Sequence, residues 1–319
     1  MEKREEELKI KIVFLDVKTI GEDIDLSAFD ELGEVIKYDF SAATEVPARV
    51  EDADVIILNK VLVNEETVGT AKKLKLVCVT ATGTDNLDKA YLEERGIAWR
   101  NVAGYSTETV AQHTFALLFY LYEKLRYYDD YVKEEHYIED RLFTHFAQVF
   151  HEISGKTWGI IGLGNIGRRV ADIAKLFGCR VIYYSTSGKN SQPGYERVDF
   201  DTLLKESDIV SVHAPLTDAT QNLMNQEAFA KMKSSAVFLN LGRGPIVVES
   251  DLVDALEQGK IAAAGLDVLC AEPMRADNPL RRIKDSNKLF ITPHIAWASI
   301  EARTRLMATI AGQIREFFL

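Results

Sequence analysis

Apolar residues along this chain gather in short runs, separated by stretches with helical spacing or by turn residues. Such continuous apolar runs are typical of strands that are covered on both faces of a sheet. The expected strands are 10–15, 35–38, 54–58, 76–80, 97–99, 158–161, 180–184, 208–212, 236–240, 262–266 and 289–291. Because strands alternate with helices, the pattern predicts an α/β fold with parallel sheets and right-handed crossovers.

Helices are predicted between the strands from periodicity and from their end signals. The expected helices are 26–32, one starting after Asn64, one starting at Asp88, one from 107 to about 132, 165–177, one starting at 249 or 250, and 299–318. The helix from 107 is apolar nearly all round between Ala111 and Leu121, which predicts burial between domains or in a dimer interface. No element is assigned in the mixed, aromatic stretch 127–153.

Three glycines stand between an expected strand and an expected helix. Gly162 allows a tight turn, Gly164 lets a pyrophosphate approach the backbone, and Gly167 lets helix and strand pack closely. The free N–H groups and the dipole at the start of that helix favour an anion. A glycine-rich turn without function is the alternative, but the order of strand, glycines and helix favours a dinucleotide site.

Composition and charge argue against several classes of function. The 319 residues suffice for two domains, and a formal net charge of −11 disfavours a nucleic-acid or anionic-membrane partner. The three scattered cysteines lack metal-ligand spacing, so we expect reduced thiols and no metal site. The segment 1–9 is charged, unlike a signal peptide, and no run is long enough to span a bilayer. These features predict a cytoplasmic protein.

Polar candidates for chemistry follow expected strands in the second half of the chain. Arg243 lies between Gly242 and Gly244, and its guanidinium can bind a carboxylate through two parallel hydrogen bonds. His294 can transfer a proton near neutral pH, and a carboxylate such as Glu272 beside it would favour the imidazolium and fix its tautomer. The alternatives are a surface arginine in a turn and a structural histidine at a strand end. Among the other histidines, His213 lies in an expected cofactor loop, whereas no such setting is found for His113, His136, His145 and His151.

Several motifs, taken in order, resemble the D-isomer-specific 2-hydroxyacid dehydrogenase family. They are the glycine loop at 162–167, Asn-Leu-Gly-Arg-Gly at 240–244, Asp-Val-Leu-x-x-Glu-Pro at 267–273 and Thr-Pro-His-Ile-Ala-Trp at 292–297. The resemblance covers essentially the whole chain and is greatest to the glycerate dehydrogenase, or hydroxypyruvate reductase, branch. It implies two doubly wound parallel-sheet domains. A flavodoxin-like substrate domain would comprise 1–103 and 295–319, and a Rossmann NAD(P)-binding domain would comprise 104–294.

The resemblance also implies roles for individual residues, with the active site in the cleft between the domains. Arg243 would bind the substrate carboxylate and carbonyl oxygen, His294 would be the general acid/base, and Glu272 would hydrogen-bond His294. The implied cofactor-binding residues are Gly162, Gly164, Asn165, Ile166, Gly167, Ser185, Thr186, His213, Ala214, Pro215, Thr220, Leu241, Gly242, Arg243, Asp267 (at the nicotinamide) and His294. The implied substrate-binding residues are Thr82, Gly83, Tyr105, Arg243, His294 and Trp297.

The implied reaction is hydride transfer between NAD(P)H and a short 2-oxo acid, giving a D-2-hydroxy acid. Hydroxypyruvate and glyoxylate, reduced to D-glycerate and glycolate, are the expected pairs. A D-lactate-type reductase is the close alternative, and a cofactor-sensing, corepressor-like protein is a rival from another class. Ser185 replaces the acid expected about 20 residues after the glycines, so NADP(H) can serve in place of NAD(H), with help from Lys189. A homodimer is expected.

Overall fold

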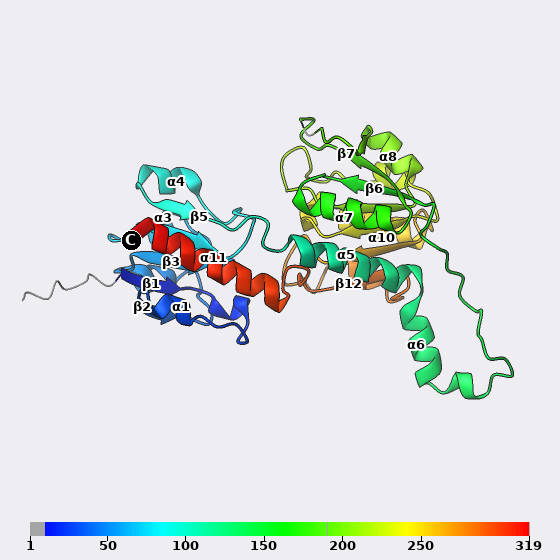
Figure 1. Ribbon diagram of the computed structural model, residues 1–319, viewed down its shortest axis with the longest axis horizontal. Helices are drawn as coiled ribbons and strands as arrows, with labels where there is room; N and C mark the ends of the chain where they lie inside the picture. The colour runs from blue at the N-terminus through cyan, green and yellow to red at the C-terminus, as the bar shows by residue number, and fades with distance from the viewer. Residues whose placement is uncertain (1–9, 190, 319) are drawn as a thin grey trace, which may run out of the picture. The chain divides into compact units, whose positions relative to one another are not determined.

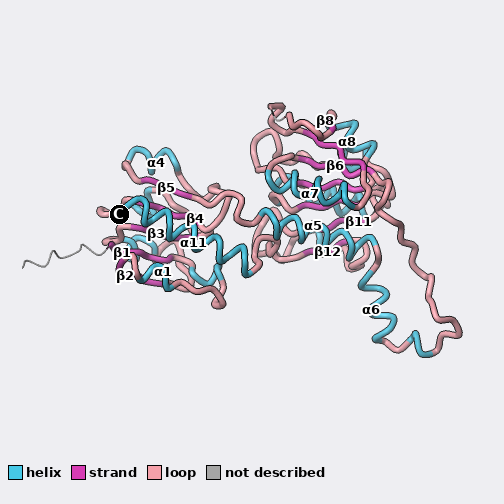
Figure 2. Tube along the Cα trace, viewed as in Figure 1, coloured by secondary structure: helices cyan, strands magenta, loops and turns pink. Residues whose placement is uncertain are grey.

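The chain divides into two compact units in a computed structural model that describes residues 10–189 and 191–318. Unit 1 is formed by Met1–Ser106 and Ala298–Leu319, and unit 2 by Thr107–Trp297. Figures 1 and 2 show the elements of each unit. The segment 1–9, which the sequence marks as charged, lies outside the described residues.

Unit 1 contains a five-stranded sheet in the order β2-β1-β3-β4-β5. Its strands are β1 (Ile10–Phe14), β2 (Gly33–Lys37), β3 (Val55–Leu58), β4 (Leu76–Val79) and β5 (Ala98–Arg100). All of these strands pair in parallel, with Phe14 beside Ile57 and Leu58 beside Val79. This order is that of flavodoxin-like, doubly wound sheets.

Short helices and one long helix complete unit 1. They are α1 (Ser27–Asp30), α2 (Val46–Val50), α3 (Glu65–Val68), α4 (Lys89–Glu94) and α11 (Ile300–Phe318). Asn64 caps α3 by accepting from the Thr67 amide, as the sequence predicted. The long helix α11 buries Leu306, Ile310 and Ile314, the apolar positions that its spacing marks for the core.

Unit 2 contains a seven-stranded sheet in the order β12-β11-β10-β9-β6-β7-β8. Its strands are β6 (Thr157–Ile161), β7 (Arg180–Tyr184), β8 (Glu196–Arg197), β9 (Ile209–Val212), β10 (Val237–Asn240), β11 (Ala263–Leu266) and β12 (Leu289–Ile291). All pairings are parallel, and the order reverses direction between β6 and β9. The prediction of two doubly wound parallel sheets is therefore confirmed.

Helix α5 (Thr107–Tyr122) is buried on the sheet of its own unit. A Cβ added to Gly265 on β11 would lie 3.3 Å from Leu117 Cβ and 3.2 Å from Leu121 Cδ1. The ring of Phe115 packs against Trp158 of β6 at 4.9 Å between centroids. The prediction that this helix is buried is therefore confirmed, and the strands of its own unit cover the side chains that face them. Its placement in a dimer interface or between domains stays a prediction. The other helices of unit 2 are α6 (Leu125–Lys133), α7 (Asn165–Leu176), α8 (Phe200–Glu206), α9 (Gln226–Lys231) and α10 (Glu249–Glu257).

The single helix predicted from 107 to about 132 is instead two helices. Lys124 adopts a left-handed conformation, with φ of 58°, and separates α5 from α6. After α6 the chain forms a 3-10 turn at His136–Ile138 and then returns to β6 along an irregular path, drawn in green in Figure 1. This returning segment, 138–150, exposes the apolar side chains of Ile138, Leu142, Phe143, Phe146, Val149 and Phe150.

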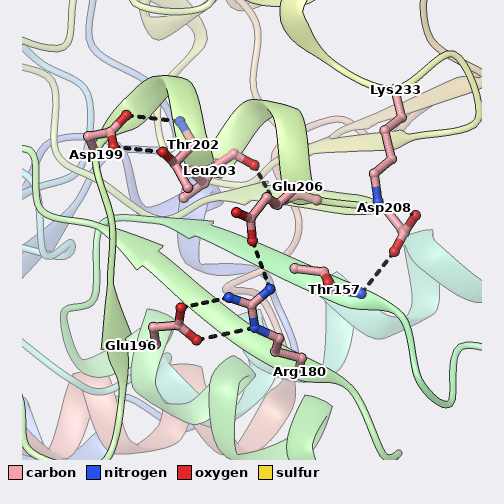
Figure 3. A network of polar contacts seen from close by, with 10 residues as sticks. Thr157, Arg180, Glu196, Asp199, Thr202, Leu203, Glu206, Asp208 and Lys233 are labelled. Carbon is pink, nitrogen blue, oxygen red and sulfur yellow. Dashed lines mark hydrogen bonds and ion pairs between the residues drawn. The ribbon is translucent and has the colours of Figure 1, made fainter.

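A polar network joins the amino ends of the central strands of unit 2 (Figure 3). Arg180 contacts Glu196 at 2.6 Å and Glu206 at 2.7 Å. Asp208 accepts from the Thr157 amide and pairs with Lys233, both at 2.9 Å. These side chains fix the amino edge of the sheet and leave its carboxyl edge to the candidate site. Within 10–189 and 191–318, no helix is long and apolar enough to cross a membrane.

Candidate active site

The candidate residues of unit 2 follow β6, β7, β9, β10, β11 and β12, so they gather at the carboxyl edge of one parallel sheet. Ligands of doubly wound sheets bind at this edge, where the strand order reverses. Here the reversal lies between β6 and β9, and the loops after these two strands touch. A Cβ added to Gly162 would come within 2.8 Å of the Ala214 backbone.

The glycine turn has the geometry that a dinucleotide site needs. Gly162 has a φ of 91°, a conformation that side chains disfavour. A Cβ on Gly167 would meet the Gly162 carbonyl oxygen at 2.3 Å, so only glycine permits this packing of α7 on β6. A Cβ on Gly164 would meet nothing within 4 Å, so the backbone there is open to a ligand. Asn165 and Ile166 begin α7, whose first N–H groups suit a phosphate.

The loop after β9 adds a half-buried histidine, whose Nδ1 is fully buried, beside the glycine turn. Trp158 Nε1 donates to Ser211 Oγ at 2.9 Å, and Ser211 Oγ lies 3.0 Å from His213 Nε2. Burial lowers the pKa of His213 to about 3, so its ring is neutral. Among the described side chains, none bonds the buried Nδ1 of His213, which fits a polar group of a bound nucleotide.

Thr220 braces the same loop. Its hydroxyl donates to the Pro215 carbonyl at 2.8 Å and accepts from the Thr217 amide at 2.8 Å. Ser185, in the loop after β7, is buried, Thr186 is half-buried, and Lys189 is exposed. The residues 185–189 include no carboxylate that would repel a ribose 2′-phosphate.

Arg243 is aimed by a buried side chain that the sequence analysis did not single out. Asn240, at the end of β10, accepts from the Gly242 amide at 3.1 Å and donates to the Arg243 carbonyl at 3.0 Å. Leu241 is buried within this braced turn. A Cβ on Gly244 would lie 1.9 Å from the Leu269 carbonyl carbon, so the arginine loop packs directly on the loop that leads to Glu272. The signal in the sequence was an asparagine at the end of an apolar run, because parallel sheets bind ligands where their strands end.

Glu272 and His294 form a pair on neighbouring loops. His294 Nδ1 lies 2.7 Å from Glu272 Oε2, and Glu272 Oε1 accepts from the Leu269 amide at 2.9 Å. The two side chains are 26% and 30% exposed, so the pair is accessible to a ligand but not fully solvated. Because Nδ1 faces the carboxylate, the other ring nitrogen is left to exchange a proton with a substrate.

Asp267 holds the turn that carries His294. Its buried carboxylate accepts from the Thr292 hydroxyl at 2.6 Å and from the Ile295 and Ala296 amides at 2.9 Å. Its carbonyl accepts from the His294 amide at 2.8 Å. The resemblance implied that Asp267 contacts the nicotinamide, and in the structure its carboxylate accepts from three groups of the His294 turn.

The remaining candidates belong to other segments of the chain. In unit 1, Thr82 follows β4, and its hydroxyl donates to the Val102 carbonyl at 3.0 Å. Gly83 is next to it, and Tyr105 is buried, with its carbonyl accepting from Arg305 at 2.9 Å. Trp297 is half-buried at the end of unit 2. No group of three or more metal-ligating side chains is found in the part of the chain that the structure describes.

Comparison with known proteins gives consistent matches. The family model described as D-isomer specific 2-hydroxyacid dehydrogenase, NAD binding domain, matches residues 115–296. The hydroxypyruvate reductase of Blautia hydrogenotrophica is 38% identical over 97% of both chains. The glycerate dehydrogenase of Methylorubrum extorquens is 34% identical over 96% of both chains. A solved acyclic imino acid reductase, in complex with NADPH and D-Arg, is 30% identical over 97% of both chains, with a TM-score of 0.84.

Proposed function

This chain belongs to the D-isomer specific 2-hydroxyacid dehydrogenase family, and on that premise we propose that it reduces short 2-oxo acids to D-2-hydroxy acids. Hydroxypyruvate and glyoxylate are the proposed substrates, with D-glycerate and glycolate as products. The observation that carries the proposal is the pair of His294 Nδ1 and Glu272 Oε2, 2.7 Å apart, together with the packing of the Arg243 loop on the loop that leads to Glu272.

In this proposal Arg243, His294 and Glu272 have different roles in the reaction. Arg243 binds the substrate carboxylate and carbonyl oxygen, which orients the carbonyl and stabilises the charge that develops on its oxygen. His294 gives the proton on Nε2 to that oxygen, and Glu272 stabilises the imidazolium before transfer. Thr82, Gly83, Tyr105 and Trp297 are proposed as further substrate contacts, with the Thr82 and Gly83 amides donating to the carboxylate.

The residues of unit 2 fit a nicotinamide dinucleotide. The glycine turn and the start of α7 suit its pyrophosphate, and the unpartnered Nδ1 of His213 suits a polar group of the nucleotide. When bound, the nicotinamide supplies the hydride. We propose that NADP(H) is accepted, because Ser185 stands where a carboxylate would repel a 2′-phosphate and Lys189 lies close along the chain.

The test follows loss of NADH or NADPH absorbance with hydroxypyruvate, glyoxylate, pyruvate and phenylpyruvate. We expect Arg243→Ala and His294→Ala each to lose at least ~100-fold in kcat/KM while cofactor affinity survives. Arg126→Ala and His136→Ala are the matched controls, because both side chains are exposed and both lie in or just after α6. Near-normal turnover in either site variant rejects its role.

The same assay separates the rival functions. A preference for pyruvate would favour the D-lactate-type alternative. No turnover with any 2-oxo acid, together with tight cofactor binding, would favour the corepressor-like reading. The three cysteines are free and two of them are buried, which agrees with the proposed cytoplasmic location.

We also propose a homodimer, formed through the segment 138–150. Its apolar side chains are exposed in a single chain, with Phe143 91% and Phe146 80% exposed, and exposed apolar patches mark association sites. Phe143→Ser with Phe146→Ser should yield a monomer by analytical ultracentrifugation. Phe40→Ser, in unit 1 and 70% exposed, should leave the mass unchanged. A monomeric wild-type protein would refute this proposal.

A further inference from the structure

His113 joins a buried hydrogen-bonded cluster at the turn that carries His294. Its Nε2 lies 3.0 Å from Thr292 Oγ1 and 3.6 Å from Asp267 Oδ1. It projects from α5, which packs on β10, β11 and β12 of the same unit. The side chains of His113 and Asp267 are 19% and 1% exposed, so the cluster is largely shielded from water. The sequence analysis found no such setting for His113, and these contacts, to residues distant along the chain, supply a candidate one.

The protons in this cluster have one consistent arrangement. Thr292 Oγ1 lies 2.6 Å from Asp267 Oδ1, and a carboxylate only accepts, so the hydroxyl proton points to Asp267. The threonine oxygen then accepts from His113, whose ring must carry a proton on Nε2. Burial lowers the pKa of His113, and the nearby Asp267 carboxylate opposes this shift only in part. The ring is therefore neutral at neutral pH, in the Nε2–H form.

The cluster holds a strained backbone. His294 has a φ of 56°, a left-handed conformation that costs free energy for a residue with a side chain. Its amide donates to the Asp267 carbonyl at 2.8 Å, and the next two amides, of Ile295 and Ala296, donate to the Asp267 carboxylate. If the carboxylate rotates, these contacts weaken and the His294 ring moves relative to Glu272.

We propose that His113 is a positioning residue for His294, acting through the hydroxyl of Thr292 and the carboxylate of Asp267. By donating to Thr292, it keeps the hydroxyl proton directed at Asp267 and the carboxylate aligned with the turn. The proposal rests on the proposed function, because the orientation of the His294 ring affects the rate of substrate reduction only if this ring exchanges a proton with the substrate.

The test compares His113→Met with His113→Gln. Met and Gln are unbranched and similar in size, but only the Gln amide can donate to Thr292. We expect His113→Met to lower kcat for hydroxypyruvate about tenfold, with an unchanged KM for the cofactor and a larger isotope effect from deuterated NADH. His113→Gln should return kcat to within about threefold of wild type.

A second readout needs no substrate. The proton shared between His294 Nδ1 and Glu272 should give a downfield signal in NMR, assigned by its loss in His294→Ala. We expect this signal to shift in His113→Met and to return in His113→Gln.

Two outcomes would overturn the proposal: equal losses of kcat and signal in both variants, or no change in His113→Met. If the Met variant does not fold, Thr292→Val and Thr292→Ser make the same comparison, because only Ser keeps the hydroxyl. A wild-type protein that reduces no 2-oxo acid refutes the proposed function, while the NMR comparison still decides whether His113 positions His294.

Discussion

Replacing His213 should remove a large part of the acid sensitivity of unit 2. Desolvation lowers the pKa of this ring to about 3, whereas an unfolded chain protonates histidine near pH 6.5. Below pH 6.5 the unfolded state therefore binds a proton that the folded state does not bind. The free energy of unfolding falls as the pH falls, until about pH 3. Linkage gives a loss of about 2 kcal/mol between about pH 7.5 and about pH 5 from this one residue.

The assay is urea unfolding at a series of pH values, followed by tryptophan fluorescence in a Trp99→Phe, Trp297→Phe background, which leaves Trp158 as the reporter. Trp158 donates to the hydroxyl that contacts His213. His213→Gln should be less stable at neutral pH but should lose about 2 kcal/mol less than wild type on acidification. His136→Gln is the control, since its side chain is 60% exposed, and it should keep the wild-type pH slope. Parallel pH slopes for His213→Gln and wild type would refute the reasoning.

Three further predictions concern the site. Glu272→Gln should lower kcat/KM by about 10- to 100-fold with normal cofactor affinity, because the amide is uncharged and keeps only one of the two accepting oxygens. A kcat/KM equal to that of wild type would contradict this. Ser185→Asp should raise the ratio of kcat/KM for NADH over NADPH at least ~10-fold, and an unchanged ratio would count against the 2′-phosphate argument. Gly167→Ala should weaken cofactor binding in calorimetry and destabilise unit 2 by at least ~2 kcal/mol, since its Cβ would lie 2.3 Å from a carbonyl oxygen. Gly312→Ala, a helical glycine with open space around it, should be neutral or stabilising, so equal destabilisation would refute the steric account.

The sequence was sufficient for features that short segments encode. Apolar runs located the strands of the described chain except β8, whose two residues, Glu196 and Arg197, are charged. Gly162 and Gly167 marked the turn, because backbone packing there excludes any side chain. Asn64 and Asp88 marked helix starts because a cap is satisfied within a few residues. The residues of a single turn or cap can thus be recognised without knowledge of tertiary contacts.

Features that depend on distant partners could not be predicted in this way. The periodicity of α5 showed that its apolar face is buried but not which surface covers it. His113 meets Thr292, which is 179 residues away along the chain, so neither residue alone signals the cluster. The break at Lys124 also lacked a local signal, because neither glycine nor proline marks this left-handed residue.

The discontinuity of unit 1 has a consequence for biosynthesis. Its final helix arrives only after the whole of unit 2 has been translated, and Arg303 of that helix bonds the Ile20 carbonyl and Asp23, some 280 residues earlier. A nascent chain can therefore complete unit 2 on the ribosome while unit 1 still awaits the apolar face that Leu306, Ile310 and Ile314 provide. Any stop codon before this helix leaves unit 1 with an uncovered core, so such products should be substrates for chaperones and proteases.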